Sequence, residues 1–165
     1  MWTVIKFDSK KIEFLKQDFK KRLGGDIKIY IPKLTIQKYE NNKKAIKEYN
    51  LLGDYLFCFH KKFKDSSIKK SLRFTRGLKY FLIGSTESQG EISEFIKRCK
   101  DSEDKNGYIS QSFFEIYINS NYEFTSGPFA SKIFKIINLQ KNKIDILLEN
   151  IKVKINRNQS LFRPV

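Results

Sequence analysis

The chain holds few of the side chains that bind metals or act as nucleophiles. His60 is its one histidine, and its two cysteines, Cys58 and Cys99, lack the spacing of metal ligands. Neither a Gly-x-Ser-x-Gly elbow nor a P-loop sequence occurs. We expect both cysteines to be reduced thiols with a structural role.

Carboxylates are the remaining candidates for acid–base chemistry. Most of them are scattered over stretches whose spacing indicates solvated helical faces. Asp101, Glu103 and Asp104 are clustered, but in a polar segment with no rigid element to hold them. The sequence therefore predicts a protein that is not an enzyme and that uses no cofactor or metal ion.

Basic residues carry the strongest signal in the composition. The formal net charge is +15, and the excess lies mainly in residues 1–105, which hold 25 Lys and Arg against 14 Asp and Glu. Such a field attracts polyanions, of which nucleic acid is the commonest in cells. Lys, Asn, Ile, Phe and Tyr are all abundant, as an A+T-rich genome would also produce, so charge alone does not identify the partner.

No apolar run approaches the length needed to cross a bilayer, and the start of the chain shows no signal-peptide pattern. We expect a cytoplasmic protein with no membrane partner.

The first hundred residues alternate between strand and helix patterns. Asp8 or Ser9 can cap a helix that ends at Gly24–Gly25, and residues 34–50 form an exposed arm, a hairpin or flexible loop. Strands are predicted at 2–7, 27–31, 55–59 and 78–83, and further helices at 65–74 and 91–99. This order predicts an α+β fold, with an antiparallel sheet flanked by helices.

The last third of the chain contains short strand patterns, which are clearer than the helical spacing within 129–148. Strands are predicted at 113–124, 133–139, 144–148 and 151–155, with Glu149–Asn150 as a two-residue turn. We expect a small five-stranded β-barrel. The predicted domains are residues 1–104 and 113–165, joined by a linker at 105–112.

Four segments in this order resemble the NusG family of transcription elongation factors. They are Trp2 to Phe7, Leu51 to Phe57, Thr75 to Phe81 and Gly127 to Ala130. In that family the first three belong to the N-terminal domain, called NGN, and Gly-Pro-Phe-Ala opens the C-terminal KOW domain. The resemblance covers almost the whole chain.

The departures point to a specialised member. Gly53–Asp54 replaces the usual Pro-Gly, Ile133 or Phe134 stands where a KOW glycine is typical, and the last hairpin loop is shortened to Glu149–Asn150. The chain is somewhat more similar to RfaH-like paralogues, in which the KOW domain can refold into a helical hairpin.

The resemblance implies binding to RNA polymerase, on the clamp helices of the largest subunit. The residues that would bind the polymerase are Phe7, Leu52, Tyr55, Phe57 and Phe81. The alternative for each is a place in the core. The residues that would face the DNA of the transcription bubble are Lys10, Lys11, Lys69, Lys70, Arg73 and Arg76. For Arg76 the alternative is a role in fixing its own turn.

The implied function is the control of pausing, antitermination or termination by a factor that bridges the polymerase cleft. The KOW domain, marked by Gly127, Pro128 and Phe129, would recruit a ribosomal protein or a termination factor, although the shortened hairpin loop alters the usual contact. The family precedent is a monomer.

Three other functions compete with this one. A ribosome- or RNA-binding KOW protein would explain the charge but not the N-terminal domain. A sequence-specific DNA-binding regulator would need a helix-turn-helix spacing that the chain lacks. An enzyme with an unrecognised carboxylate pair would need the histidines or glycine-rich loops that are scarce here.

Overall fold

The computed structural model describes residues 1–40, 43–110, 113–157 and 160–165. They fall into two compact units. The first contains Met1–Lys33 and Asn50–Asp101, and the second contains Leu34–Tyr49 and Ser102–Val165. The hairpin at 34–49 thus lies between two segments of the first unit in the sequence. It is part of the second unit, because its residues make their contacts there. Residues 41–42 of the predicted arm and 111–112 of the predicted linker lie outside the described residues.

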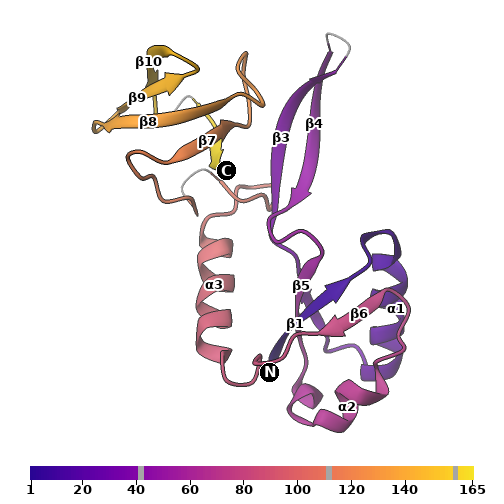
Figure 1. Ribbon diagram of the computed structural model, residues 1–165. Helices are drawn as coiled ribbons and strands as arrows, with labels where there is room; N and C mark the ends of the chain where they lie inside the picture. The colour runs from indigo at the N-terminus through magenta and orange to yellow at the C-terminus, as the bar shows by residue number, and fades with distance from the viewer. Residues whose placement is uncertain (41–42, 111–112, 158–159) are drawn as a thin grey trace. The chain divides into compact units, whose positions relative to one another are not determined.

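The first unit is a four-stranded antiparallel sheet with helices on both faces (Figure 1). Its strands are β1 (Trp2–Phe7), β2 (Lys28–Tyr30), β5 (Tyr55–Phe59) and β6 (Leu78–Phe81), in the order β2-β5-β1-β6. Its helices are α1 (Ile12–Leu23), α2 (Ser66–Ser71) and α3 (Gln89–Asp101), with single 3₁₀ turns η1 (Ser9–Lys11) and η2 (Lys61–Lys64). This is the order of elements that the sequence predicted.

Alternation along β1 and β5 divides the apolar side chains between the two faces of the sheet. One face buries Ile5, Phe7, Leu56 and Cys58 against α1, whose inner residues are Leu15, Phe19 and Leu23. On the other face, Phe57 packs with Ile92 and Ile96 of α3. Cys58 and Cys99 are buried free thiols.

The second unit is built mainly of strands in its described residues. The hairpin of β3 (Lys33–Glu40) and β4 (Lys43–Asn50) forms a two-stranded sheet. The strands β7 (Asn121–Phe124), β8 (Ile133–Leu139), β9 (Lys143–Leu148), β10 (Ile151–Asn156) and β11 (Phe162–Pro164) form a five-stranded antiparallel sheet in the order β10-β9-β8-β7-β11. Its core contains Tyr122, Phe124, Phe134, Ile136, Ile144, Ile146 and Phe162.

The α+β fold class is therefore confirmed: an antiparallel sheet with helices is followed by a five-stranded antiparallel sheet. No α-helix forms in the described part of 113–165, so this region is in a strand form and not a helical hairpin.

Candidate docking site and nucleic-acid interface

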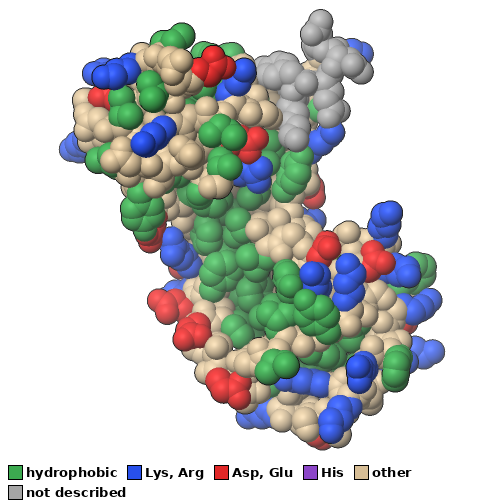
Figure 2. All heavy atoms as spheres, viewed as in Figure 1, with side chains coloured by type: hydrophobic (Ala, Val, Ile, Leu, Met, Phe, Trp, Pro, Cys, Tyr) green, Lys and Arg blue, Asp and Glu red, His purple; other side chains and the backbone are tan. Residues whose placement is uncertain are grey.

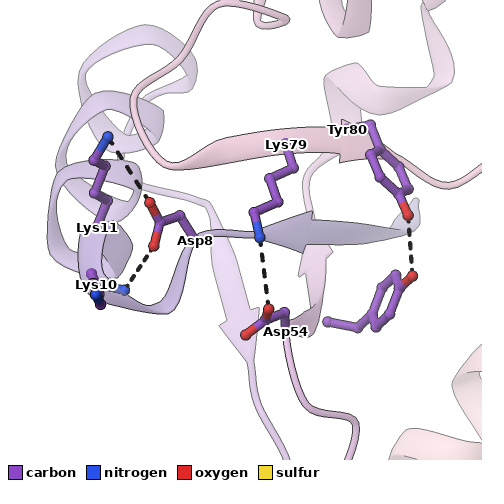
Figure 3. Close-up of polar contacts among 7 residues, drawn as sticks. Asp8, Lys10, Lys11, Asp54, Lys79 and Tyr80 are labelled. Atoms are coloured by element: carbon purple, nitrogen blue, oxygen red, sulfur yellow. Dashed lines mark hydrogen bonds and ion pairs between the residues drawn. The ribbon is translucent and has the colours of Figure 1, made fainter.

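A row of three side chains crosses the sheet of the first unit on the α3 side. Lys6 of β1 lies opposite Tyr55 of β5 and opposite Tyr80 of β6. Because directly paired residues point to the same face, the three side chains lie next to one another. The Lys6 Nζ is 5.1 Å from the centre of the Tyr55 ring and 5.9 Å from that of Tyr80. The two tyrosine hydroxyls are 3.1 Å apart and share a hydrogen bond (Figure 3).

The next row carries the apolar part of the same face. Phe57 lies opposite Val4 and packs on Phe95 of α3, with ring centres 5.7 Å apart. Leu52 packs against the same cluster. A shallow hollow is lined by the apolar side chains of Leu52, Phe57, Ile92 and Phe95 and, at α3 and the residue before it, by Glu91 and Ser88. Figure 2 shows hydrophobic side chains gathered on the first unit where α3 meets the sheet.

These two rows bring together three of the five residues that the sequence assigned to polymerase binding. Leu52, Tyr55 and Phe57 lie on the α3 side, together with Tyr80 and Phe95. We call these five residues the aromatic face. Phe57 itself is 5% exposed and forms the floor, whereas Tyr80 is 47% exposed.

The other two predicted docking residues lie on the opposite side of the sheet. Phe7 is 1% exposed and belongs to the core under α1. The Phe81 ring lies 6.4 Å from that of Phe19 and 5.9 Å from that of Phe63, in the same core. Both side chains therefore belong to the core, which was the alternative that the sequence analysis gave for them.

Tyr80 and Phe95 were not singled out from the sequence. The signal for Tyr80 was its alternation with Phe81, because neighbours in a strand point to opposite faces. Phe95 lies in the helix predicted at 91–99, but that prediction did not say which face of the sheet its side chain would meet. That depends on the packing of α3, which a local pattern does not encode.

Electrostatics set the charge of the Lys6 row. The Tyr55 hydroxyl and the two phenol rings raise the pKa of Lys6, and the hydrogen bond with Tyr80 lowers the pKa of Tyr55. The charge of Asp54 also raises the pKa of Lys6, but its carboxylate lies 3.7 Å from the Nζ of Lys79 (Figure 3). Lys6 is thus an ammonium with no ion pair among the described residues.

The predicted nucleic-acid-facing lysines at the start of α1 are exposed. Asp8 caps the η1 turn by accepting from the Lys10 backbone N–H at 3.1 Å, and it lies 3.9 Å from the Lys11 Nζ (Figure 3). The Lys10 side chain is free of ion pairs among the described residues.

Arg76 is committed to a structural contact. Its Nε and Nη2 donate to the two carboxylate oxygens of Asp18 at 3.0 and 2.7 Å, and its guanidinium lies 4.8 Å from the centre of the Phe14 ring. This fork-to-carboxylate geometry is the strongest form of such a pair, and it lowers the pKa of Asp18. Arg76 therefore joins the turn before β6 to α1.

The remaining basic candidates belong to α2 and the turn after it. Lys70 and Arg73 are exposed, whereas Lys69 is half-buried and its pKa is lowered by that burial. The structure places them on one segment with Arg76, and Lys10 and Lys11 come from the turn before α1.

The Gly-Pro-Phe segment forms the turn between β7 and β8. Gly127 has φ +80°, and its carbonyl accepts from the Ala130 N–H at 3.1 Å. The Phe129 ring lies 5.8 Å from that of Phe124 and remains 45% exposed. Only one side of this ring is covered by the unit's core.

Two other kinds of site are absent from the described ranges. No group of three or more His, Cys, Asp or Glu side chains there is placed to hold a metal ion. None of the helices described is long and apolar enough to span a bilayer.

Comparison with known proteins gives structural likenesses only. No protein-family model and no curated protein matches the chain. It is similar to a chain of the MjSpt4:Spt5 complex in conformation B, with a TM-score of 0.35 and 12% identity over 100% of this chain and 98% of that chain. It is also similar to NusG of Thermotoga maritima, with a TM-score of 0.31 and 11% identity over 94% of this chain and 91% of that chain. Both likenesses are too weak to assign the chain to a family.

Proposed function

We propose that this protein is a transcription elongation factor that docks on RNA polymerase through the aromatic face. The observation that carries the proposal is the assembly of Leu52, Tyr55 and Phe57 on one half-open face of the first sheet. The resemblance took these three residues from one segment, Leu51 to Phe57, and Tyr80 of β6 and Phe95 of α3 join them on this face from two other elements.

The physical character of this face suits a protein partner. Tyr and Phe supply large contact areas with few rotatable bonds, and such residues dominate the energy of protein interfaces. The half-open hollow beside Phe95 offers a recess for an apolar side chain. The resemblance of the four sequence segments to NusG supplies the identity of the partner, namely the clamp helices of the largest polymerase subunit.

The basic residues complete the proposed arrangement. Lys10, Lys70 and Arg73 are exposed and would face the DNA of the transcription bubble, with Lys11 and Lys69 beside them. Arg76 would act chiefly by holding this surface on α1 through Asp18. A factor that bridges the cleft favours the elongating polymerase only by its differential affinity for that state, typically about 1–3 kcal/mol.

The second unit would recruit a further partner, a ribosomal protein or a termination factor, with Phe129 on its exposed turn. The proposed protein works in the cytoplasm as a monomer. The partner that the second unit binds would then determine whether the protein suppresses pausing, prevents termination or promotes it.

Co-purification with the organism's own core RNA polymerase tests the docking step. We expect the full chain to be retained and the Tyr80→Ala and Tyr55→Ala variants to be lost. Phe74→Ala is the matched control, because Phe74 is an aromatic residue of the same unit that is 86% exposed and lies outside the aromatic face.

Equal retention of all four proteins would show that the face does not dock on polymerase. No retention of the unsubstituted chain would favour the alternative of a basic RNA- or ribosome-binding protein. Salt-dependent binding of the full chain to RNA would then be the next measurement.

A further inference from the structure

Lys6 is an unusual residue to find within a docking surface of this kind. The cores of protein interfaces are depleted of charged residues and of lysine in particular. Lys6 nevertheless stands between Tyr55 and Tyr80, in the row that adjoins the apolar hollow. A partner that covers the aromatic face also covers this ammonium.

The first unit does not neutralise Lys6. Its contacts are a hydrogen bond with the Tyr55 hydroxyl and the faces of two phenol rings at 5.1 and 5.9 Å, none of which carries a net charge. Asp54 lies closer to Lys79, at 3.7 Å from its Nζ. Like other partly exposed lysines, Lys6 is protonated at neutral pH. Covering an unpaired ammonium costs free energy unless the partner brings an opposite charge.

We infer that the polymerase surface that docks on the aromatic face carries an Asp or Glu carboxylate opposite Lys6. This inference rests on the proposed function and adds to it a rule for the choice of partner. A phosphate would also match the charge. The neighbouring side chains Leu52, Phe57 and Phe95 favour a protein, because they offer an apolar surface on which a nucleic-acid backbone gains little.

The two tyrosines prepare Lys6 for this role. Their rings flank the Lys6 side chain from both neighbouring strands. They therefore restrict its conformations and hold the ammonium near the centre of the row. The hydrogen bond between the two hydroxyls fixes the rings in turn. A partner carboxylate in contact with Nζ could also accept a hydrogen bond from one of the two hydroxyls, namely the one that does not donate to the other.

The test is the affinity of the full chain for its own core polymerase at several salt concentrations. Lys6→Met keeps an unbranched stem over the rings and removes the charge. Lys79→Met removes the same charge from the same sheet, at a lysine that already has an acidic neighbour. We expect Lys6→Met to weaken binding about tenfold at low salt and to flatten the salt dependence. Lys79→Met should stay within about twofold of the unsubstituted chain.

Zero-length carbodiimide cross-linking of the complex supplies an independent readout. This reagent joins an amine to a carboxylate that touches it, so a peptide containing Lys6 should be recovered linked to an Asp or Glu of the polymerase. The Lys6→Met complex should lack that product.

The outcomes separate the inference from the proposed function. If Tyr80→Ala abolishes binding while Lys6→Met binds as well as or more tightly than the unsubstituted chain, the face docks on polymerase but the carboxylate is absent. If Tyr80→Ala has no effect, the proposed function fails and the inference with it. If Lys6→Met weakens binding to single-stranded DNA in the absence of polymerase, and not binding to polymerase, the site takes phosphate.

Discussion

Gly77 stands where the turn before β6 comes closest to the start of α1. Its φ is +80°, and a Cβ at this position would lie 2.7 Å from the backbone oxygen of Lys11. The Asp8 N–H also donates to the Gly77 carbonyl at 2.8 Å. The contact leaves no room for a side chain, and the glycine therefore serves the packing of two elements as well as its own turn.

Replacing this glycine should cost more than replacing one with the same backbone conformation in open space. We expect Gly77→Ala to lower the free energy of unfolding by about 2–3 kcal/mol, from left-handed strain plus the clash with Lys11. The control is Gly53→Ala, since Gly53 has φ +58° and a Cβ there would meet no atom within 4 Å, so that this change should cost only about 1 kcal/mol. Urea unfolding followed by the fluorescence of Trp2, in β1, measures both. Equal costs would contradict the role of the close contact.

His60 gives the first unit a pH dependence of predictable sign. It is 1% exposed, its Nδ1 accepts from the Lys62 N–H at 3.2 Å, and burial lowers its pKa from 6.5. The unfolded chain therefore binds this proton more readily than the folded chain does. The contribution of His60 to the free energy of unfolding is complete above pH 6.5. It falls as the pH drops below that value, by at most about 1.4 kcal/mol per pH unit.

His60→Asn should remove this part of the slope, because asparagine can accept the same backbone hydrogen bond and does not titrate. Urea unfolding at pH 5.5 and pH 7.5, again followed by Trp2, compares the two proteins. The variant's absolute stability will also change with the loss of ring packing on Phe63, so the difference between the two pH values is the readout. An unchanged difference would mean that other groups set the pH dependence.

For single residues, the sequence predicted the kind of role a side chain plays better than the residue that it contacts. It offered a turn-fixing role for Arg76 beside a DNA-facing one, and the pair with Asp18 favours the first. It could not find Asp18, which lies 58 residues earlier on another element. The resemblance assigned Phe7 and Phe81 to a docking surface, and the alternating pattern could not correct this, because it does not reveal which face of a sheet a helix will cover.

The elements themselves were largely predictable where local patterns were strong. The β9–β10 hairpin was predicted from two runs of alternating Ile, Leu and Val and the two-residue turn at Glu149–Asn150, and Leu148 pairs with Ile151 as that turn requires. The three-residue strand β11 was missed, because so short a segment has no period to detect. The aromatic run before β7 was expected to be a strand, but the strand begins only at Asn121.

The link between α1 and the turn before β6 is the contact between elements most open to measurement. A double-mutant cycle with Asp18→Asn and Arg76→Gln should give a favourable coupling free energy. The control cycle uses Glu13 and Lys16, whose atoms are equally close at 2.7 Å but whose side chains are 71% and 44% exposed, against 17% for Asp18. We expect the Asp18–Arg76 coupling to be the larger, since the pair is bidentate and its carboxylate is shielded. A coupling no larger than that of the control would make Arg76 free for a ligand.

At the scale of the whole molecule, the charge of +15 has two possible meanings with different consequences. If the positive field as a whole attracts nucleic acid, any two lysines contribute alike. If a local surface contacts phosphates, the residues around α2 contribute more than equally exposed lysines elsewhere. Composition could predict the attraction, but only the placement of side chains can predict where it acts.

Two matched charge-removing variants of the full chain distinguish these meanings. Lys70→Gln with Arg73→Gln removes two charges from the proposed DNA-facing segment. Lys141→Gln with Lys143→Gln removes two exposed charges at the start of β9. Binding to a single-stranded oligonucleotide, measured by fluorescence polarisation across a salt series, gives the slope of log affinity against log salt. For the first variant we expect this slope to shrink by about 0.7 for each phosphate that the protein no longer neutralises, and for the second we expect little change. Equal flattening in both variants would assign the attraction to the net charge and leave Lys70 and Arg73 with no specific part in binding.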